Sequence, residues 1–136
     1  MRRSLRPPSF LRLSCASSAR GEATASIPGS VALRVSIVGI DRAKAREPAE
    51  VWLAITEDGL ESAIERGENA RPRLQHVAVV RQMRVIGNVD FRKLEIFVAE
   101  STVRLLPEWN HENLNAVVFV QERRGRRILA AGQLSL

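Results

Sequence analysis

Cysteine is almost absent from this chain of 136 residues, because Cys15 is the only one. A single cysteine excludes an internal disulfide, a CxxC redox pair and a zinc site built from cysteines. A stable β-domain can do without disulfides in any compartment, so the cysteine count leaves the location of the protein open. No dithiol chemistry can reside in this chain alone.

Histidine and catalytic motifs are equally scarce. His76 and His111 are the only histidines, and they form neither an HxH nor an HExxH pattern. The sequence also lacks the GxSxG turn of a nucleophile elbow and the glycine-rich loops that bind phosphates. We therefore predict that the protein is not an enzyme, and we expect no catalytic residue, no metal and no cofactor.

Long apolar runs are missing as well. No stretch of 18 apolar residues occurs, so a membrane-spanning helix is not expected. At the N-terminus, Pro7, Pro8 and Arg12 interrupt the apolar segment that a secretory signal needs. We predict a disordered basic leader, or a degenerate signal, over residues 1–29 and a single folded domain over residues 30–136.

The formal net charge of +6 is concentrated in the leader. Residues 1–30 carry five arginines and one glutamate, whereas residues 31–136 carry 16 basic and 14 acidic side chains. This near balance weakens a nucleic-acid interpretation of the folded part. The basic turn "RRGRR" at residues 123–127 could hold phosphate or a headgroup, but a solvated hairpin tip is the simpler interpretation. Nucleic acid is therefore an unlikely partner.

What the sequence does contain, from residue 31 onward, is an alternation of apolar and polar residues. In the first segment Val31, Leu33, Val35 and Ile37 share one face, which is typical of a half-buried strand. Turn residues separate seven such segments: 31–40, 49–56, 59–65, 74–86, 92–100, 113–122 and 127–136. Seven short strands in about 105 residues predict an all-β fold, an antiparallel β-sandwich.

Finer expectations follow from the same pattern. Segments 49–56 and 59–65 are expected to form a hairpin around Glu57, Asp58 and Gly59. The mixed faces of segment 74–86 indicate a β-bulge or a strand covered on both faces. The last two segments should pair through the basic turn, and "PEWNHENL" could form one short helical turn. In segment 92–100 we expect Leu94, Ile96 and Val98 to face inward.

The densest polar turn lies between segments 59–65 and 74–86. Its residues Arg66, Gly67, Glu68 and Asn69 could bind an anion or polar ligand, with His76 and Arg81 as possible neighbours. Alternatively, Gly67 and Asn69 only supply the positive φ values that a connection between strands often needs. We favour this structural interpretation of the turn.

The resemblance to a known family rests on four stretches: "RGENA", "VVRQMRVIG", "LNAVVFVQE" and "RRILAAGQL". Through them, residues 30–136 resemble the C-terminal β-domain of that family. It is the bacterial, secreted, thioredoxin-like family called domain of unknown function 1223. In that family a thioredoxin-like domain with a CxxC motif precedes the β-domain, and here it is missing. The resemblance implies a truncated or split member with an exported, periplasmic or secreted, ancestry, and it marks residues 66–69 as the family signature.

Two functions are compatible with these observations. The leading hypothesis is a noncatalytic accessory β-domain that packs against a thioredoxin-like domain, in a longer chain or a partner, and so exposes an apolar patch. The alternative is a small ligand-binding or enzymatic protein whose site is the turn at residues 66–69. A third possibility is binding of nucleic acid or an anionic membrane by the leader and the basic turn. The oligomeric state is left open.

Overall fold

The computed structural model describes residues 10–16, 29–63, 73–76 and 78–136. Within these ranges the chain forms nine strands and one 3-10 turn, η1 (His111–Asn113). The strands are β1 (Phe10–Ala16), β2 (Ser30–Val38), β3 (Ala49–Glu57), β4 (Leu60–Ala63), β5 (Arg73–His76), β6 (Val79–Val89), β7 (Ile96–Arg104), β8 (Leu114–Glu122) and β9 (Ile128–Ser135). The predicted all-β class is confirmed, and η1 lies where the short helical turn was expected.

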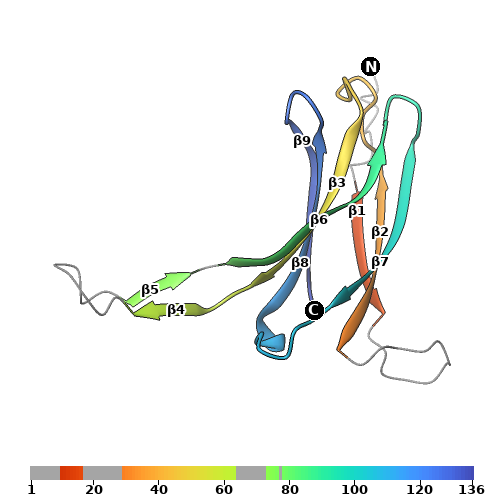
Figure 1. The fold of residues 1–136 in the computed structure, drawn as a ribbon. Helices are drawn as coiled ribbons and strands as arrows, with labels where there is room; N and C mark the ends of the chain where they lie inside the picture. Colours follow the sequence, from red (N-terminus) through yellow and green to blue (C-terminus); the bar gives the residue numbers. More distant parts are fainter. Residues whose placement is uncertain (1–9, 17–28, 64–72, 77) are drawn as a thin grey trace, which may run out of the picture.

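Two antiparallel sheets face each other as a sandwich (Figure 1). One sheet has the order β1-β2-β7 and the other has the order β6-β3-β8-β9. The β8–β9 hairpin closes through the basic turn as predicted. In the described part of the chain, the sandwich contains seven strands, and β4 and β5 form a separate two-stranded ribbon.

Strand β1 lies inside the segment predicted to be a leader. Phe10–Ala16 pairs antiparallel with β2 along its whole length. The side chain of Leu11 packs so closely over β9 that a Cβ atom on Gly132 would lie 2.5 Å from its Cδ2 atom. Residues 10–16 therefore form an edge strand of the three-stranded sheet. Nearby prolines and arginines mask the alternation of apolar and polar residues in "FLRLSCA". Residues 1–9 and 17–28 lie outside the described ranges.

The core lies between the inner faces of the two sheets. Leu33, Val35 and Ile37 of β2 are at most 1% exposed, as the alternation predicted. Apolar residues of β3 and β8 face them, namely Val51, Leu53, Ile55, Ala116, Val118 and Val120. Burial of each large aliphatic side chain stabilises the fold by roughly 1.5–3 kcal/mol.

The inward face predicted for β7 is wrong. Leu94, Ile96 and Val98 are 53%, 58% and 49% exposed, whereas Val103 is fully buried. Ile96, Phe97 and Val98 are all apolar, so alternation at this end of the strand does not define a face. Val103 fixes the true parity, which places Phe97 and the other odd-numbered residues of β7 toward the core.

Strand β6 contains the irregularity expected in segment 74–86. Its register with β3 shifts twice, so that Arg81 and Ile86 are extra residues with no direct partner. Each bulge reverses the parity of the residues that follow it. Consequently Val80, Met83 and Val85 all lie on the outer face, opposite Thr56, Ala54 and Trp52 of β3.

The expected hairpin around Glu57, Asp58 and Gly59 is not formed. Instead β4 pairs with β5, with Leu60 opposite His76 and Ala63 opposite Arg73. Gly59 has φ +73°, a conformation that strains other residues, and it redirects the chain out of the sandwich. The resulting ribbon extends away from the body (Figure 1), with Ala63 and Arg73 at its far end.

Candidate functional site

The signature turn belongs to the connection between β4 and β5. Residues 66–69 belong to the segment 64–72, which lies outside the described ranges and joins the far ends of β4 and β5. His76 is placed in the backbone of β5, but its side chain is not described. Arg81 is the one described side chain of the set, and it lies at the base of the ribbon.

Arg81 is engaged by a buried carboxylate. Its Nε atom donates to Oε2 of Glu57 at 2.7 Å, and the Glu57 side chain is only 3% exposed. The other oxygen, Oε1, accepts the backbone N–H of Asn110 at 3.1 Å. Glu57 thus ties β6 and the loop before η1 to the end of β3. This arrangement gives Arg81 a structural partner and weakens its assignment to a ligand site.

A second group of polar contacts fixes the same junction. Asp58 donates its backbone N–H to the carbonyl of Asn113 at 3.0 Å, and its Oδ2 accepts from Nδ2 of Asn115 at 2.8 Å. Ser135 Oγ donates to Oδ1 of Asn115 at 3.3 Å. Because Asn115 is buried, these bonds satisfy polar groups that would be costly to leave unpaired. The base of the ribbon is therefore anchored to β8 and β9.

Glu57 should make folding stability pH-dependent. The hydrogen bond from Arg81 is the main cause that lowers the Glu57 pKa below its ordinary value of 4.5, against the opposing effect of burial. The N–H of Asn110 and the nearby Arg81 and His111 charges lower it further. A folded-state pKa below the unfolded value adds stability above about pH 4.5, and this stability is lost as the pH falls through the folded-state pKa.

We expect Glu57→Gln to be less stable than the unsubstituted protein at pH 7 and to approach it as the pH falls below about 4.5. Urea unfolding of both proteins across this range measures the difference. Subtracting the free energies of unfolding of the two proteins at each pH removes the contributions of Asp90 and Glu47, whose pKa values are also lowered. A stability difference that stays constant from neutral to acidic pH would contradict a role for Glu57 ionisation.

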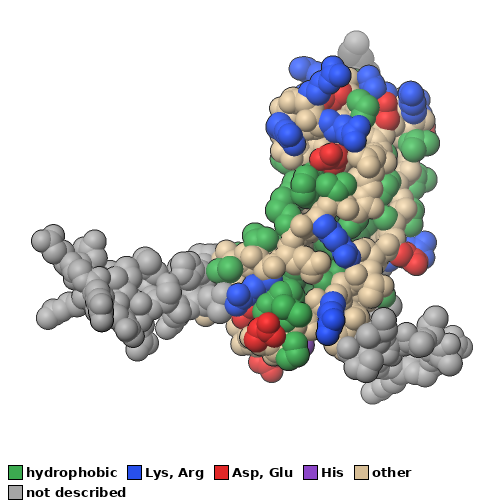
Figure 2. Space-filling view, in the orientation of Figure 1, with side chains coloured by type: hydrophobic (Ala, Val, Ile, Leu, Met, Phe, Trp, Pro, Cys, Tyr) green, Lys and Arg blue, Asp and Glu red, His purple; other side chains and the backbone are tan. Residues whose placement is uncertain are grey.

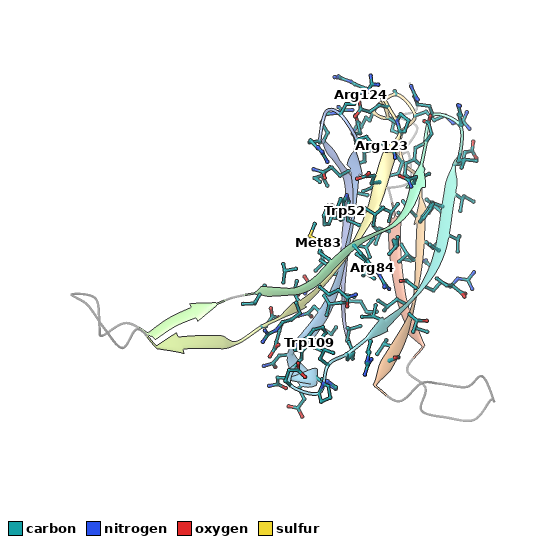
Figure 3. All side chains as sticks on the ribbon, viewed as in Figure 1. Trp52, Met83, Arg84, Trp109, Arg123 and Arg124 are labelled. Carbon is teal, nitrogen blue, oxygen red and sulfur yellow. The ribbon has the colours of Figure 1, made fainter. Side chains whose placement is uncertain are left out.

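The outer face of the four-stranded sheet carries an exposed apolar surface. We call it the apolar face, and it consists of Trp52, Val80, Met83, Val85 and Phe119. Val80, Met83 and Val85 are 55%, 49% and 38% exposed, and they lie beside the aromatic pair Trp52 and Phe119. Figure 3 shows Trp52 and Met83 on the same side of the sandwich.

Trp52 and Phe119 form the rigid centre of the apolar face. Their rings stack across β3 and β8 with centroids 6.2 Å apart and planes inclined by 9°. The Nε1–H of Trp52 is buried and has no acceptor among the described residues. Alternation within one segment could not reveal the apolar face, because the face combines three strands and depends on the bulge at Arg81.

The basic turn at residues 123–127 folds against another loop. The backbone N–H groups of Arg124 and Gly125 both donate to Oε1 of Glu47, the latter at 2.8 Å. The bond from Gly125 is the main cause that lowers the pKa of Glu47 below its ordinary value. The turn's amides thus bind an internal carboxylate, although the Arg124 side chain remains exposed.

In the ranges that the structure describes, no three His, Cys, Asp or Glu side chains form a group that could hold a metal ion. The same ranges contain no helix with the length and hydropathy to cross a membrane.

These observations define an antiparallel β-sandwich with an apolar outer sheet face and a projecting ribbon. The chain belongs to the family described as "Protein of unknown function (DUF1223)", whose model matches residues 12–121. None of the curated proteins matches it.

A solved structure has a similar fold. The chain matches HBP35 of Porphyromonas gingivalis with a TM-score of 0.59 and 14% sequence identity. The match covers 95% of this chain and 41% of that chain, so the chain spans about two fifths of the length of that protein. At this identity the likeness shows the fold alone.

Proposed function

We propose that the protein is a noncatalytic accessory β-domain that packs through the apolar face against a thioredoxin-like domain. The exposure of Val80, Met83 and Val85 around the stacked pair Trp52 and Phe119 carries this proposal. Isolated apolar side chains on a surface are common, but a contiguous set on one sheet face marks an interaction site. A flat, rigid aromatic centre is also typical of the residues that dominate binding energy.

The partner belongs either to a longer version of this chain or to a separate protein. The family resemblance provides the thioredoxin-like domain, together with a bacterial, exported setting. The ribbon supports the arrangement, because it projects from the sandwich and offers a neighbouring domain a second place of contact (Figure 1). The intact mass of the native protein decides between the two forms, since a mass well above 15.1 kDa requires a longer chain.

Met83→Lys tests the docking surface directly. The probe is the thioredoxin-like domain of a longer family member, produced as a separate chain and titrated calorimetrically with this protein. Placing a charge in the apolar face should weaken the binding by more than about tenfold, because it would be buried without a partner.

Val98→Lys is the matched control for this substitution. Val98 and Met83 are both 49% exposed, but Val98 lies on β7, on the outer face of the other sheet. The control should bind as the unsubstituted protein does. Equal weakening by the two variants, or no binding by the unsubstituted protein, would contradict docking through the apolar face.

A further inference from the structure

The three loops at one end of the sandwich bring together cations that are far apart in sequence. We call this region the basic end, and it consists of loops 39–48, 90–95 and 123–127. These loops hold nine lysines and arginines and four carboxylates. The connection at the opposite end, residues 105–113, contains two glutamates and no lysine or arginine. The near-balanced charge of the domain therefore conceals a strong asymmetry, visible as the cluster of basic side chains in Figure 2.

Five cations of the basic end remain exposed and form no ion pair with a carboxylate of the described chain: Lys44, Arg46, Lys93, Arg124 and Arg126. The other four arginines are paired, as Arg42 is with Glu95 at 3.1 Å. The basic end thus contains two groups of cations: paired arginines that hold the loops, and unpaired cations that face solvent. Unpaired cations in such a group produce a positive potential that attracts anionic surfaces.

Paired arginines fix the loops that carry the unpaired cations. Arg92 donates from Nη1 to the carbonyl of Arg46 at 3.1 Å, and Arg127 donates from Nη2 to the carbonyl of Lys44. Arg126 has φ +59°, a left-handed conformation that costs energy for any residue with a Cβ atom. A glycine would fit this position at lower strain, so the arginine occupies it at a local conformational cost.

Exposed aliphatic side chains accompany the cations. Leu94 lies in loop 90–95, and Ile128 directly follows the basic turn, and each is 53% exposed. Phe91, the aromatic residue of loop 90–95, is buried, so this loop offers no ring for stacking on nucleic-acid bases. Cations beside exposed aliphatic groups suit a membrane interface. There, attraction to anionic headgroups and shallow insertion of apolar side chains both strengthen binding.

We propose that the basic end docks the protein peripherally on an anionic membrane surface, with the unpaired cations contacting lipid phosphates and Leu94 and Ile128 entering the interface. This role is independent of the apolar face, which lies along the side of the sandwich. It is also distinct from the leader, whose arginines are unchanged in every comparison below.

Vesicle sedimentation of the full chain tests the proposal. We expect binding to vesicles of phosphatidylcholine mixed with phosphatidylglycerol, weakening with added salt, and no binding to phosphatidylcholine alone. Arg124→Ser/Arg126→Gly should weaken this binding by more than about tenfold. The substitution at position 126 should not unfold the protein, because glycine tolerates its positive φ.

Two further variants separate the contributions of charge position and of the aliphatic side chains to vesicle binding. Arg34→Ser/Arg104→Ser removes two exposed arginines outside the basic end and should bind like the unsubstituted protein. Leu94→Ser/Ile128→Ser keeps every charge and should still weaken vesicle binding.

Four outcomes would overturn the proposal. Equal losses in both arginine variants would assign binding to overall charge, and unchanged binding in the basic-end variant would assign it to the leader. Binding of duplex DNA without vesicle binding would identify a nucleic-acid surface. Displacement from vesicles by millimolar inorganic phosphate, beyond the effect of matched ionic strength, would identify a free-phosphate site.

Discussion

Phe91→Ala is expected to destabilise the domain by about 3–5 kcal/mol, a large part of the total stability of a protein of this size. Phe91 is 1% exposed and belongs to the core although it lies in loop 90–95. The loop that carries Phe91 is held in its shape on both sides of the ring, because Asp90 binds both the backbone and the guanidinium of Arg92. That guanidinium is the main cause that lowers the pKa of Asp90 to about 2.

Phe119→Ala is the control for this prediction. Phe119 is only half-buried, on the apolar face, so the same loss of a phenyl ring should cost clearly less, mainly through the lost stacking on Trp52. Urea unfolding of the three proteins gives the comparison. Losses of equal size would show that Phe91 is not a core anchor. A large loss at Phe91 alone would establish that the core extends into the loops of the basic end.

The sequence was sufficient for the fold class because alternation along β2 is clear. In β2 a polar or small residue separates each buried aliphatic one, so the inward face could be assigned before any pairing was known. The β8–β9 hairpin was equally clear, since both strands flank a short basic turn. In these segments the burial of one face and local turn chemistry favour the same structure.

The remaining errors have physical causes. At β7 three consecutive apolar residues leave the face undefined, and Val103 settles it only through packing. At Glu57, Asp58 and Gly59 the chain has turn-forming residues, but β3 keeps its pairing with both β6 and β8 up to Glu57. The ribbon then forms from a more distant segment. Tertiary pairing therefore overrides the local turn signal.

The apolar face and the basic end were less predictable than the fold, because each depends on contacts between residues that are distant in sequence. Glu57 and Arg81 are 24 residues apart, and Arg92 reaches the carbonyl of a residue 46 positions away. The apolar face requires a bulge that shifts Met83 and Val85 outward, and the basic end requires three loops to meet. Neither can be read from composition, since the folded part has almost balanced charge.

Arg127 should be one of the most sensitive positions on the surface of the molecule, because it neutralises a buried acid. Glu122 is 1% exposed and its Oε1 accepts from Nη2 of Arg127, which also donates to the carbonyl of Lys44. Removal of the arginine leaves a buried carboxylate without a cation. The Arg127 side chain is itself 40% exposed, so solvent screens part of the interaction. We expect Arg127→Met to destabilise the protein by about 2–4 kcal/mol.

A double-mutant cycle distinguishes charge from packing. If the unpaired carboxylate causes the loss, Glu122→Gln/Arg127→Met should be more stable than Arg127→Met alone, because glutamine removes the charge and keeps the shape of the side chain. Urea unfolding of the two single variants, the double variant and the unsubstituted protein measures this coupling. Additive losses would show that Arg127 acts only through its bond to Lys44 and its packing. Coupling would show that the basic turn is held to the sheet by an ion pair, which leaves Arg124 and Arg126 as its outward charges.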